Sequence, residues 1–204
     1  MEINQLVLGD LQSNCYLLLT DKTAIVIDPG YNSETVLDFL LKNKNKEKLI
    51  LLTHGHFDHI GGALNLRNST DTHIAIGIND AEFTTNPEIN LSSQFATPLK
   101  PFDADIFLYD NQKLNVGDLE IQVIETPGHT PGGLCFLIDD YLFTGDTLFY
   151  RSIGRTDFPQ GSFLHLKQSI KKLYTLNPDL IVFSGHGPKT NINDEKLYNP
   201  FVRG

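Results

Sequence analysis

The chain has 204 residues, of which 40% are hydrophobic and 20% are charged, a composition typical of globular proteins. This length predicts one domain that spans residues 1–204 and is large enough to bury a sizeable core. The net charge of −9 argues against a nucleic-acid partner, because binding to phosphates needs a basic surface.

The N-terminal residues Met1–Gln5 lack the basic segment and apolar run of a signal peptide. Apolar runs elsewhere fall short of the ~20 residues that cross a bilayer, so we expect a cytoplasmic protein with no membrane partner. Cys15 and Cys135 each lie in an apolar, strand-like segment. We expect both to be buried small hydrophobic residues rather than a disulfide or a nucleophile.

The first half of the chain alternates strand and helix patterns. Residues 3–8, 13–19 and 23–28 predict an antiparallel meander with tight turns between its strands. Ser33 is a suitable N-cap for a helix that runs to about Lys44. The elements expected next are a strand at 48–53, a short helix after Gly61-Gly62 and a strand at 73–76.

Residues 86–112 contain three prolines and no clear period, so we predict a surface segment with a short helix at most. Regular patterns then resume. The predicted elements are strands at 113–116, 119–125, 134–138 and 141–144, a helix from about Ser162 to Leu176, and a strand at 180–183.

Residues 53–59 read Thr-His-Gly-His-Phe-Asp-His, directly after the predicted strand at 48–53. His54, His56, Asp58 and His59 therefore lie where a buried strand ends and a loop begins, a usual place for functional residues. Neutral imidazoles and carboxylates suit zinc, iron and similar metals. The alternative is a polar surface turn that happens to be rich in histidine. The density of metal-binding side chains favours a metal site.

Three further side chains repeat this placement. His129, Asp146 and His186 each follow a predicted strand and are flanked by glycine, which lets the backbone bend tightly. With the first cluster they supply five histidines and two aspartates, a number that suits two metals sharing one bridging group. His73 and His165 lack such a context, and we expect them to have packing or surface roles.

These motifs resemble the metallo-β-lactamase superfamily, and most of all its glyoxalase II (hydroxyacylglutathione hydrolase) branch. The matching residues are His54, His56, Asp58, His59, His129, Asp146 and His186, supported by Asn14-Cys15-Tyr16-Leu17, Asp28-Pro29-Gly30, Pro127-Gly128-His129-Thr130 and Gly145-Asp146-Thr147-Leu148-Phe149. The resemblance implies an α+β fold, a four-layer αββα metallo-β-lactamase sandwich with the metals at one edge of two packed sheets.

The resemblance also implies a distribution of ligands between two divalent ions, expected to be zinc, with iron or manganese as alternatives. It puts His54, His56 and His129 on the first ion. Asp58, His59 and His186 would hold the second, and Asp146 would bridge the two. The implied reaction is attack of a metal-bridging hydroxide, oriented by Asp58 and Asp146, on the carbonyl of a small thioester such as an S-acyl glutathione.

The substrate is less defined by this resemblance. About 18 residues follow His186, so we expect the C-terminal helices that hold glutathione in full-length glyoxalase II enzymes to be absent. Arg155 matches the basic substrate residue of the family, although it could equally brace a loop. Lys189 is a weaker candidate for the same anion-binding role.

The same ligands are compatible with a second branch of the fold. Persulfide dioxygenases resemble this chain around Gly154-Arg155-Thr156-Asp157-Phe158 and hold a single iron with residues matching His54, His129 and Asp146. A lactamase or lactonase and a non-enzymatic metal-binding module are less favoured alternatives. The sequence leaves the oligomeric state open.

Overall fold

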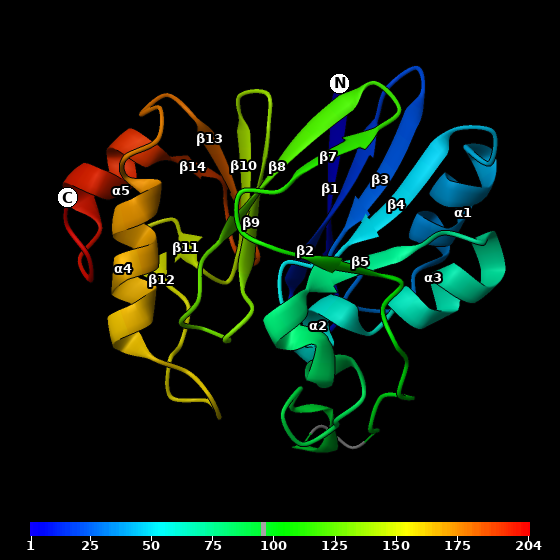
Figure 1. Ribbon diagram of the computed structural model, residues 1–204, viewed down its shortest axis with the longest axis horizontal. Coiled ribbons are helices and arrows are strands. Elements are labelled where there is room, and N and C mark those ends of the chain that lie inside the picture. The colour runs from blue at the N-terminus through cyan, green and yellow to red at the C-terminus, as the bar shows by residue number, and fades with distance from the viewer. Residues whose placement is uncertain (95–96) are drawn as a thin grey trace.

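Two six-stranded β-sheets pack face to face in the computed structural model, which describes residues 1–94 and 97–204 (Figure 1). The first sheet has the order β1-β2-β3-β4-β5-β6. Its strands are β1 Glu2–Leu8, β2 Ser13–Leu19, β3 Thr23–Ile27, β4 Glu47–Leu51, β5 Ile74–Gly77 and β6 Ile106–Leu108. The predicted meander is confirmed, since β1 and β3 both pair antiparallel with β2. From β3 to β6 the pairing is parallel.

The second sheet has the order β14-β13-β10-β9-β8-β7. Its strands are β7 Lys113–Val116, β8 Leu119–Glu125, β9 Leu134–Ile138, β10 Tyr141–Gly145, β13 Ile181–Ser184 and β14 Thr190–Asn191. A small hairpin of β11 Leu148–Phe149 and β12 Ser152–Ile153 follows β10. Parallel pairing of β10 with β13 brings the carboxyl ends of these two strands to the same edge.

Helices cover the outer faces of both sheets, which gives the four layers that the sequence predicts. On the first sheet, α1 Glu34–Lys42 and α3 Ala63–Thr70 bury Val36, Leu40 and Leu66 against its outer side. On the second sheet, α4 Phe163–Leu173 buries Leu166, Ile170 and Leu173 in the same way. A separate apolar core fills the space between the sheets. Figure 1 shows these helices on opposite sides of the sandwich.

Helix ends follow the expected capping chemistry. Ser33 accepts a hydrogen bond from the Val36 amide at the start of α1, and Ser162 accepts one from the His165 amide at the start of α4. A last helix, α5 Ile192–Tyr198, packs Ile192 into the apolar core of the second sheet. Among the described residues, no helix combines the length and apolar character needed to cross a membrane.

Two local predictions were wrong. Residues 57–60 form the single-turn helix α2 instead of a loop, closed by a hydrogen bond from the Ile60 amide to the His56 carbonyl. The segment 86–112 ends in β6, which pairs parallel with β5, a partner about thirty residues earlier in the chain. Elements of three or four residues are too short to display a period, so neighbouring structure decides them.

The same segment is less exposed than predicted, since Asn90, Leu91 and Ser92 are all buried. Its helical content agrees with the prediction: η2 is a 3-10 turn at Ser92–Gln94. A longer 3-10 segment, η1 Ile78–Thr84, precedes it directly after β5. The part of the prediction that falls on residues 95–96 lies outside the described residues.

Candidate metal centre

Both sheets contribute side chains to one cluster at the edge where their strands end. The loop after β4 carries His54 and His56, and α2 carries Asp58 and His59. From the second sheet, His129 follows β8, Asp146 follows β10 and His186 follows β13. Strand ends that are far apart in the sequence thus bring together all seven residues predicted as metal ligands.

These side chains form overlapping groups of donors, each compact enough to hold an ion. The three groups are His54–His56–His129, Asp58–His59–His186 and Asp28–His54–His59, and within each the donor atoms lie within 4.8 Å of one another. In the first group, His56 Nδ1 is 2.8 Å from His129 Nε2. In the second, His186 Nε2 is 3.3 Å from Asp58 Oδ2. The first two groups match the two ligand sets implied by the sequence.

Asp146 lies between these two groups. Its Oδ2 atom is 3.4 Å from His129 Nε2 and 3.6 Å from His186 Nε2, while its Oδ1 atom is 3.4 Å from His59 Nε2. One carboxylate therefore approaches histidines of both groups, the geometry that a bridging ligand requires.

Hydrogen bonds at the far ring nitrogen orient three of the histidines. His129 Nδ1 lies 2.7 Å from the Arg155 carbonyl oxygen. His59 Nδ1 lies 2.9 Å from Asp28 Oδ2, and His54 Nδ1 lies 3.1 Å from Thr53 Oγ1. Such partners fix the ring orientation and leave Nε2 directed into the cluster, which is the usual support of a metal-binding histidine.

Three buried atoms of the cluster make no hydrogen bond within the described part of the chain: His54 Nε2, His56 Nε2 and Asp146 Oδ1. A buried polar atom without a partner is costly, and native proteins seldom leave one. All three belong to the predicted ligands. Divalent cations would satisfy His54 Nε2 and Asp146 Oδ1, while His56 would bind through the Nδ1 atom that faces His129, so the residues present fit a metal centre.

The charge state differs between the two donor groups. Burial and the neighbouring imidazoles hold the pKa of His54 well below its ordinary value, so the ring is neutral, as a ligand must be. Against burial, which favours the protonated acid, His59 and His186 keep the pKa of Asp58 well below its usual range. Against burial, the Asp58 and Asp146 carboxylates raise the pKa of His59 to about 10, so a cation that binds this group must displace a proton from the ring.

A family model described as the metallo-beta-lactamase superfamily matches residues 8–186. The chain belongs to the metallo-β-lactamase superfamily. Its architecture agrees: a mixed α and β fold with two packed sheets is also that of the solved superfamily structures described next.

Relatives and solved structures cover nearly the whole chain. The hydroxyacylglutathione hydrolase GloC of Haemophilus influenzae is 38% identical, over 99% of this chain and 98% of its own. The structure of the B3 metallo-β-lactamase BLEG-1 has a TM-score of 0.92 with 37% identity, covering both chains fully. TTHA1623 in a di-iron-bound form has a TM-score of 0.87 with 33% identity, over 98% of this chain and 100% of that one. ETHE1 from Myxococcus xanthus has a TM-score of 0.78 with 28% identity, over 98% and 84%.

Two further carboxylates support this superfamily site without a role in the sequence prediction. Asp28, in the matched segment Asp28-Pro29-Gly30, accepts hydrogen bonds from the Thr53 amide at 2.8 Å and the Thr53 hydroxyl at 2.6 Å, beside His59. Asp80, in η1, accepts from the Gly55 amide at 2.9 Å, the Gly132 amide at 2.6 Å and the Thr130 hydroxyl at 2.7 Å.

Asp80 thereby joins the two loops that carry the first histidine group. Burial raises its pKa to about 6, against the three hydrogen bonds that favour the carboxylate. A sequence signal for it existed. Asp80 follows β5, which runs parallel to β4, so both strands deliver their next residues to the same edge of the sheet.

Replacing Asp80 with asparagine is expected to weaken metal binding at the His54–His56–His129 group by about 10- to 100-fold. The amide has one acceptor oxygen where the carboxylate has two, so its NH₂ group would face a backbone or hydroxyl donor. Competition with a chelator of known affinity measures the effect. Asp38→Asn is the matched control, because Asp38 is an exposed carboxylate on α1 that pairs with Lys42. Equal losses in both variants would contradict the expectation.

A cavity of about 380 Å³ opens above the superfamily site. His56, Asp58, His129, Asp146 and His186 line its base. Arg155 lines it too, as predicted for a substrate residue, but its guanidinium donates two hydrogen bonds to the Asp157 carboxylate. Lys189 is exposed and is not among the described residues that line this cavity.

The remaining predictions of the sequence concern residues outside the site. His73 and His165 are both exposed, which confirms their surface roles. Cys15 and Cys135 are free and fully buried, as predicted.

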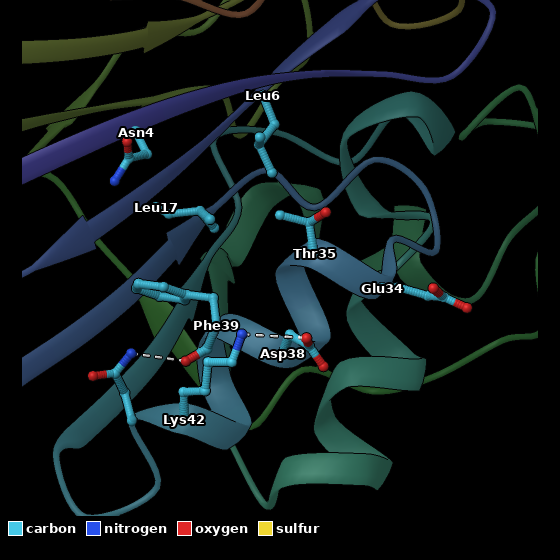
Figure 2. A pocket seen from close by; sticks show the side chains of 9 residues that line it. Asn4, Leu6, Leu17, Glu34, Thr35, Asp38, Phe39 and Lys42 are labelled. Atoms are coloured by element: carbon cyan, nitrogen blue, oxygen red, sulfur yellow. Dashed lines mark hydrogen bonds and ion pairs between the residues drawn. The ribbon is translucent and has the colours of Figure 1, made fainter.

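A second hollow, of about 580 Å³, lies between α1 and the outer side of β1 and β2 (Figure 2). Of the three charged residues that line it, Asp38 and Lys42 pair with each other, and Asn43 donates to the Phe39 carbonyl. Leu6, Leu17 and Phe39 supply apolar surface. None of its described lining residues is among those with a buried, unpartnered side-chain atom, in contrast to the metal centre.

Proposed function

We propose that this chain is a binuclear metal-dependent hydrolase that cleaves a small thioester, such as an S-acyl glutathione. The observation that carries the proposal is the position of Asp146. Its carboxylate lies within 3.6 Å of histidines in both donor groups, and the second group, Asp58–His59–His186, is complete.

We assign His54, His56 and His129 to one ion, Asp58, His59 and His186 to the other, and Asp146 to both. Zinc is the proposed metal, and the di-iron form of TTHA1623 makes iron compatible as well. When bound, divalent ions at such a site supply Lewis acidity and lower the pKa of water.

The residues of the chain position the reactants. Asp58 and Asp146 line the cavity with hydrogen-bond acceptors, and there they orient the attacking water by accepting its hydrogen bonds. Water adds to the thioester carbonyl, the carbon–sulfur bond breaks, and the products are a carboxylate and a thiol. A thiol has a pKa near 8.5, so the thiolate leaves with little help from an acid. The reaction therefore needs no dedicated acid at the base of the cavity, where the side chains are carboxylates and imidazoles.

The name of the GloC relative supports this reaction class, because hydroxyacylglutathione hydrolysis is the cleavage of a thioester. Elemental analysis of purified, untagged protein is the first test. Two divalent ions per chain, together with turnover of a panel of acyl thioesters, are the expected result. Metal-replete protein that hydrolyses none of them would overturn the proposal. A β-lactam in the same panel tests the activity in the name of BLEG-1.

A second candidate is a persulfide dioxygenase with a single iron, favoured by the similarity to ETHE1. His54, His129 and Asp146 would hold that iron, and His129 Nε2 and Asp146 Oδ2 lie 3.4 Å apart. If the purified protein holds one iron per chain and takes up oxygen with glutathione persulfide, the dioxygenase is the function and the hydrolase proposal is wrong. We place the dioxygenase second because ETHE1 is 28% identical to this chain and the hydrolase GloC is 38% identical.

A further inference from the structure

The cavity above the metal centre has apolar walls. Besides the donor residues, Arg155 and Ser152, six hydrophobic side chains line it: Leu11, Phe57, Leu91, Phe149, Ile153 and Phe158. The ring of Phe158 packs edge-on against His56 and His129 of the first donor group, with centroids 5.5 and 6.1 Å away. Phe149 packs in the same manner against His186 of the second group, at 6.0 Å. A molecule that reaches the metal centre therefore contacts aromatic and aliphatic surface.

The charge available to a substrate at these walls is small. Among the described residues that line the cavity, Arg155 is the one arginine or lysine. Its Nε and Nη2 atoms donate to both carboxylate oxygens of Asp157 at 2.9 and 2.8 Å, and its guanidinium lies 4.2 Å from the centre of the Phe158 ring. The bidentate pair occupies the face of Arg155 that would otherwise bind a substrate carboxylate.

Leu91 is held in the wall at a conformational cost. Its φ of +70° lies in the left-handed region, which a leucine seldom adopts, and its side chain is only 3% exposed. The preceding residue, Asn90, fixes the loop. The Asn90 carbonyl accepts from the Phe57 amide at 3.0 Å, and its side chain donates to the Phe83 carbonyl at 2.7 Å and accepts from the Ser92 amide at 2.9 Å. Strain sustained beside a reactive cavity points to a role in function.

We infer that this wall selects thioesters by their acyl group, and that it prefers a short apolar acyl group, aliphatic or aromatic, over a hydroxyacyl group. The inference rests on the proposed thioester hydrolysis. The thiol carriers of cells are charged and stay in water, whereas the acyl group next to the reacting carbonyl is the part that burial can favour. Each methylene buried against the wall is expected to raise kcat/KM by about fourfold until the cavity is full.

The decisive comparison uses two acyl groups of nearly equal size on the same neutral thiol, N-acetylcysteamine. The isobutyryl thioester carries a methyl group where the lactoyl thioester carries a hydroxyl. After correction for their rates with free hydroxide, we expect kcat/KM to favour isobutyryl by about tenfold. A preference for lactoyl would overturn the inference while leaving the hydrolase intact. Turnover of neither thioester would overturn both.

Variants of the wall separate selectivity from simple loss of structure. Leu91→Asn places an amide in the wall and suits the left-handed backbone, so we expect the isobutyryl preference to fall about tenfold. Leu91→Met keeps the wall apolar and should keep the preference. Phe158→Asn polarises another part of the wall, at a half-buried position, which retains the test if Leu91→Asn does not fold. Leu164→Asn, on the exposed face of α4, is the matched control. If Leu91→Asn and Phe158→Asn both fold and both keep the isobutyryl-to-lactoyl ratio of kcat/KM, the assignment of acyl selectivity to this wall is contradicted.

Discussion

Asp146→Ala is expected to reduce the metal content from two ions per chain to one or fewer, and to lower kcat/KM by about 1,000-fold or more. The carboxylate approaches donors of both groups, at 3.4 Å from His129 and from His59 and at 3.6 Å from His186. Its removal leaves neither group with its shared ligand. Several kcal/mol of transition-state stabilisation depend on such a site, and each 1.36 kcal/mol corresponds to tenfold in rate.

Elemental analysis and thioester assays on the same preparation measure both parts of this prediction. His165→Ala is the control, because that histidine lies exposed on α4, away from the cluster. Its metal content should remain that of the unmodified chain. Loss of metal in His165→Ala would show that the proposed ligand set is incomplete, and two ions retained in Asp146→Ala would rule out Asp146 as the shared ligand.

Gly185→Ala should have the second largest effect, a fall of about 100-fold in kcat/KM together with loss of the ion assigned to Asp58, His59 and His186. A Cβ atom at this position would lie 2.2 Å from Asp146 Oδ1 and 2.9 Å from His59 Cε1. These contacts are too short, so two candidate ligands must move. Displacements of about 1 Å at a reacting centre cost about 100-fold in rate.

The neighbouring glycine provides a matched control for this prediction. Gly187 lies on the other side of His186, and a Cβ atom there would meet nothing within 4 Å. Its φ of +74° makes alanine unfavourable by about 1 kcal/mol, so Gly187→Ala should lower the melting temperature and keep both ions. Equal metal loss in the two variants would mean that general destabilisation, rather than the steric contact, removes the ion.

The donor cluster and the architecture were predictable because their signals are local or periodic. Residues 53–59 concentrate four metal-binding side chains directly after a strand, and the helices capped by Ser33 and Ser162 show clear apolar stripes. Strand ends that share one edge then place His129, Asp146 and His186 beside that cluster. The superfamily resemblance assembled these pieces in the correct order.

The missed features depend on contacts between distant segments. β6 exists because β5 offers a parallel edge to Ile106–Leu108. Asp80 is an isolated carboxylate in the sequence, and it supports the site only because β5 brings it beside the Gly55 and Gly132 amides. Leu91 lies in an irregular segment that propensity assigns to the surface, whereas tertiary packing buries it.

The donor cluster lies between the two sheets, and the contacts around it also hold the sheets together. The Asn14 side chain, in β2 of the first sheet, donates to the carbonyls of Ser184 and Gly187 on either side of His186, and the Asn14 amide donates to the Gly185 carbonyl. Cations held by residues of both sheets would add to this link. Because a ligand that binds only the folded chain stabilises it by mass action, about 4 kcal/mol at a thousand times its dissociation constant, metal supply would also govern how long the folded chain survives. A cell short of metal would lose this protein through unfolding and degradation as well as through inactive sites.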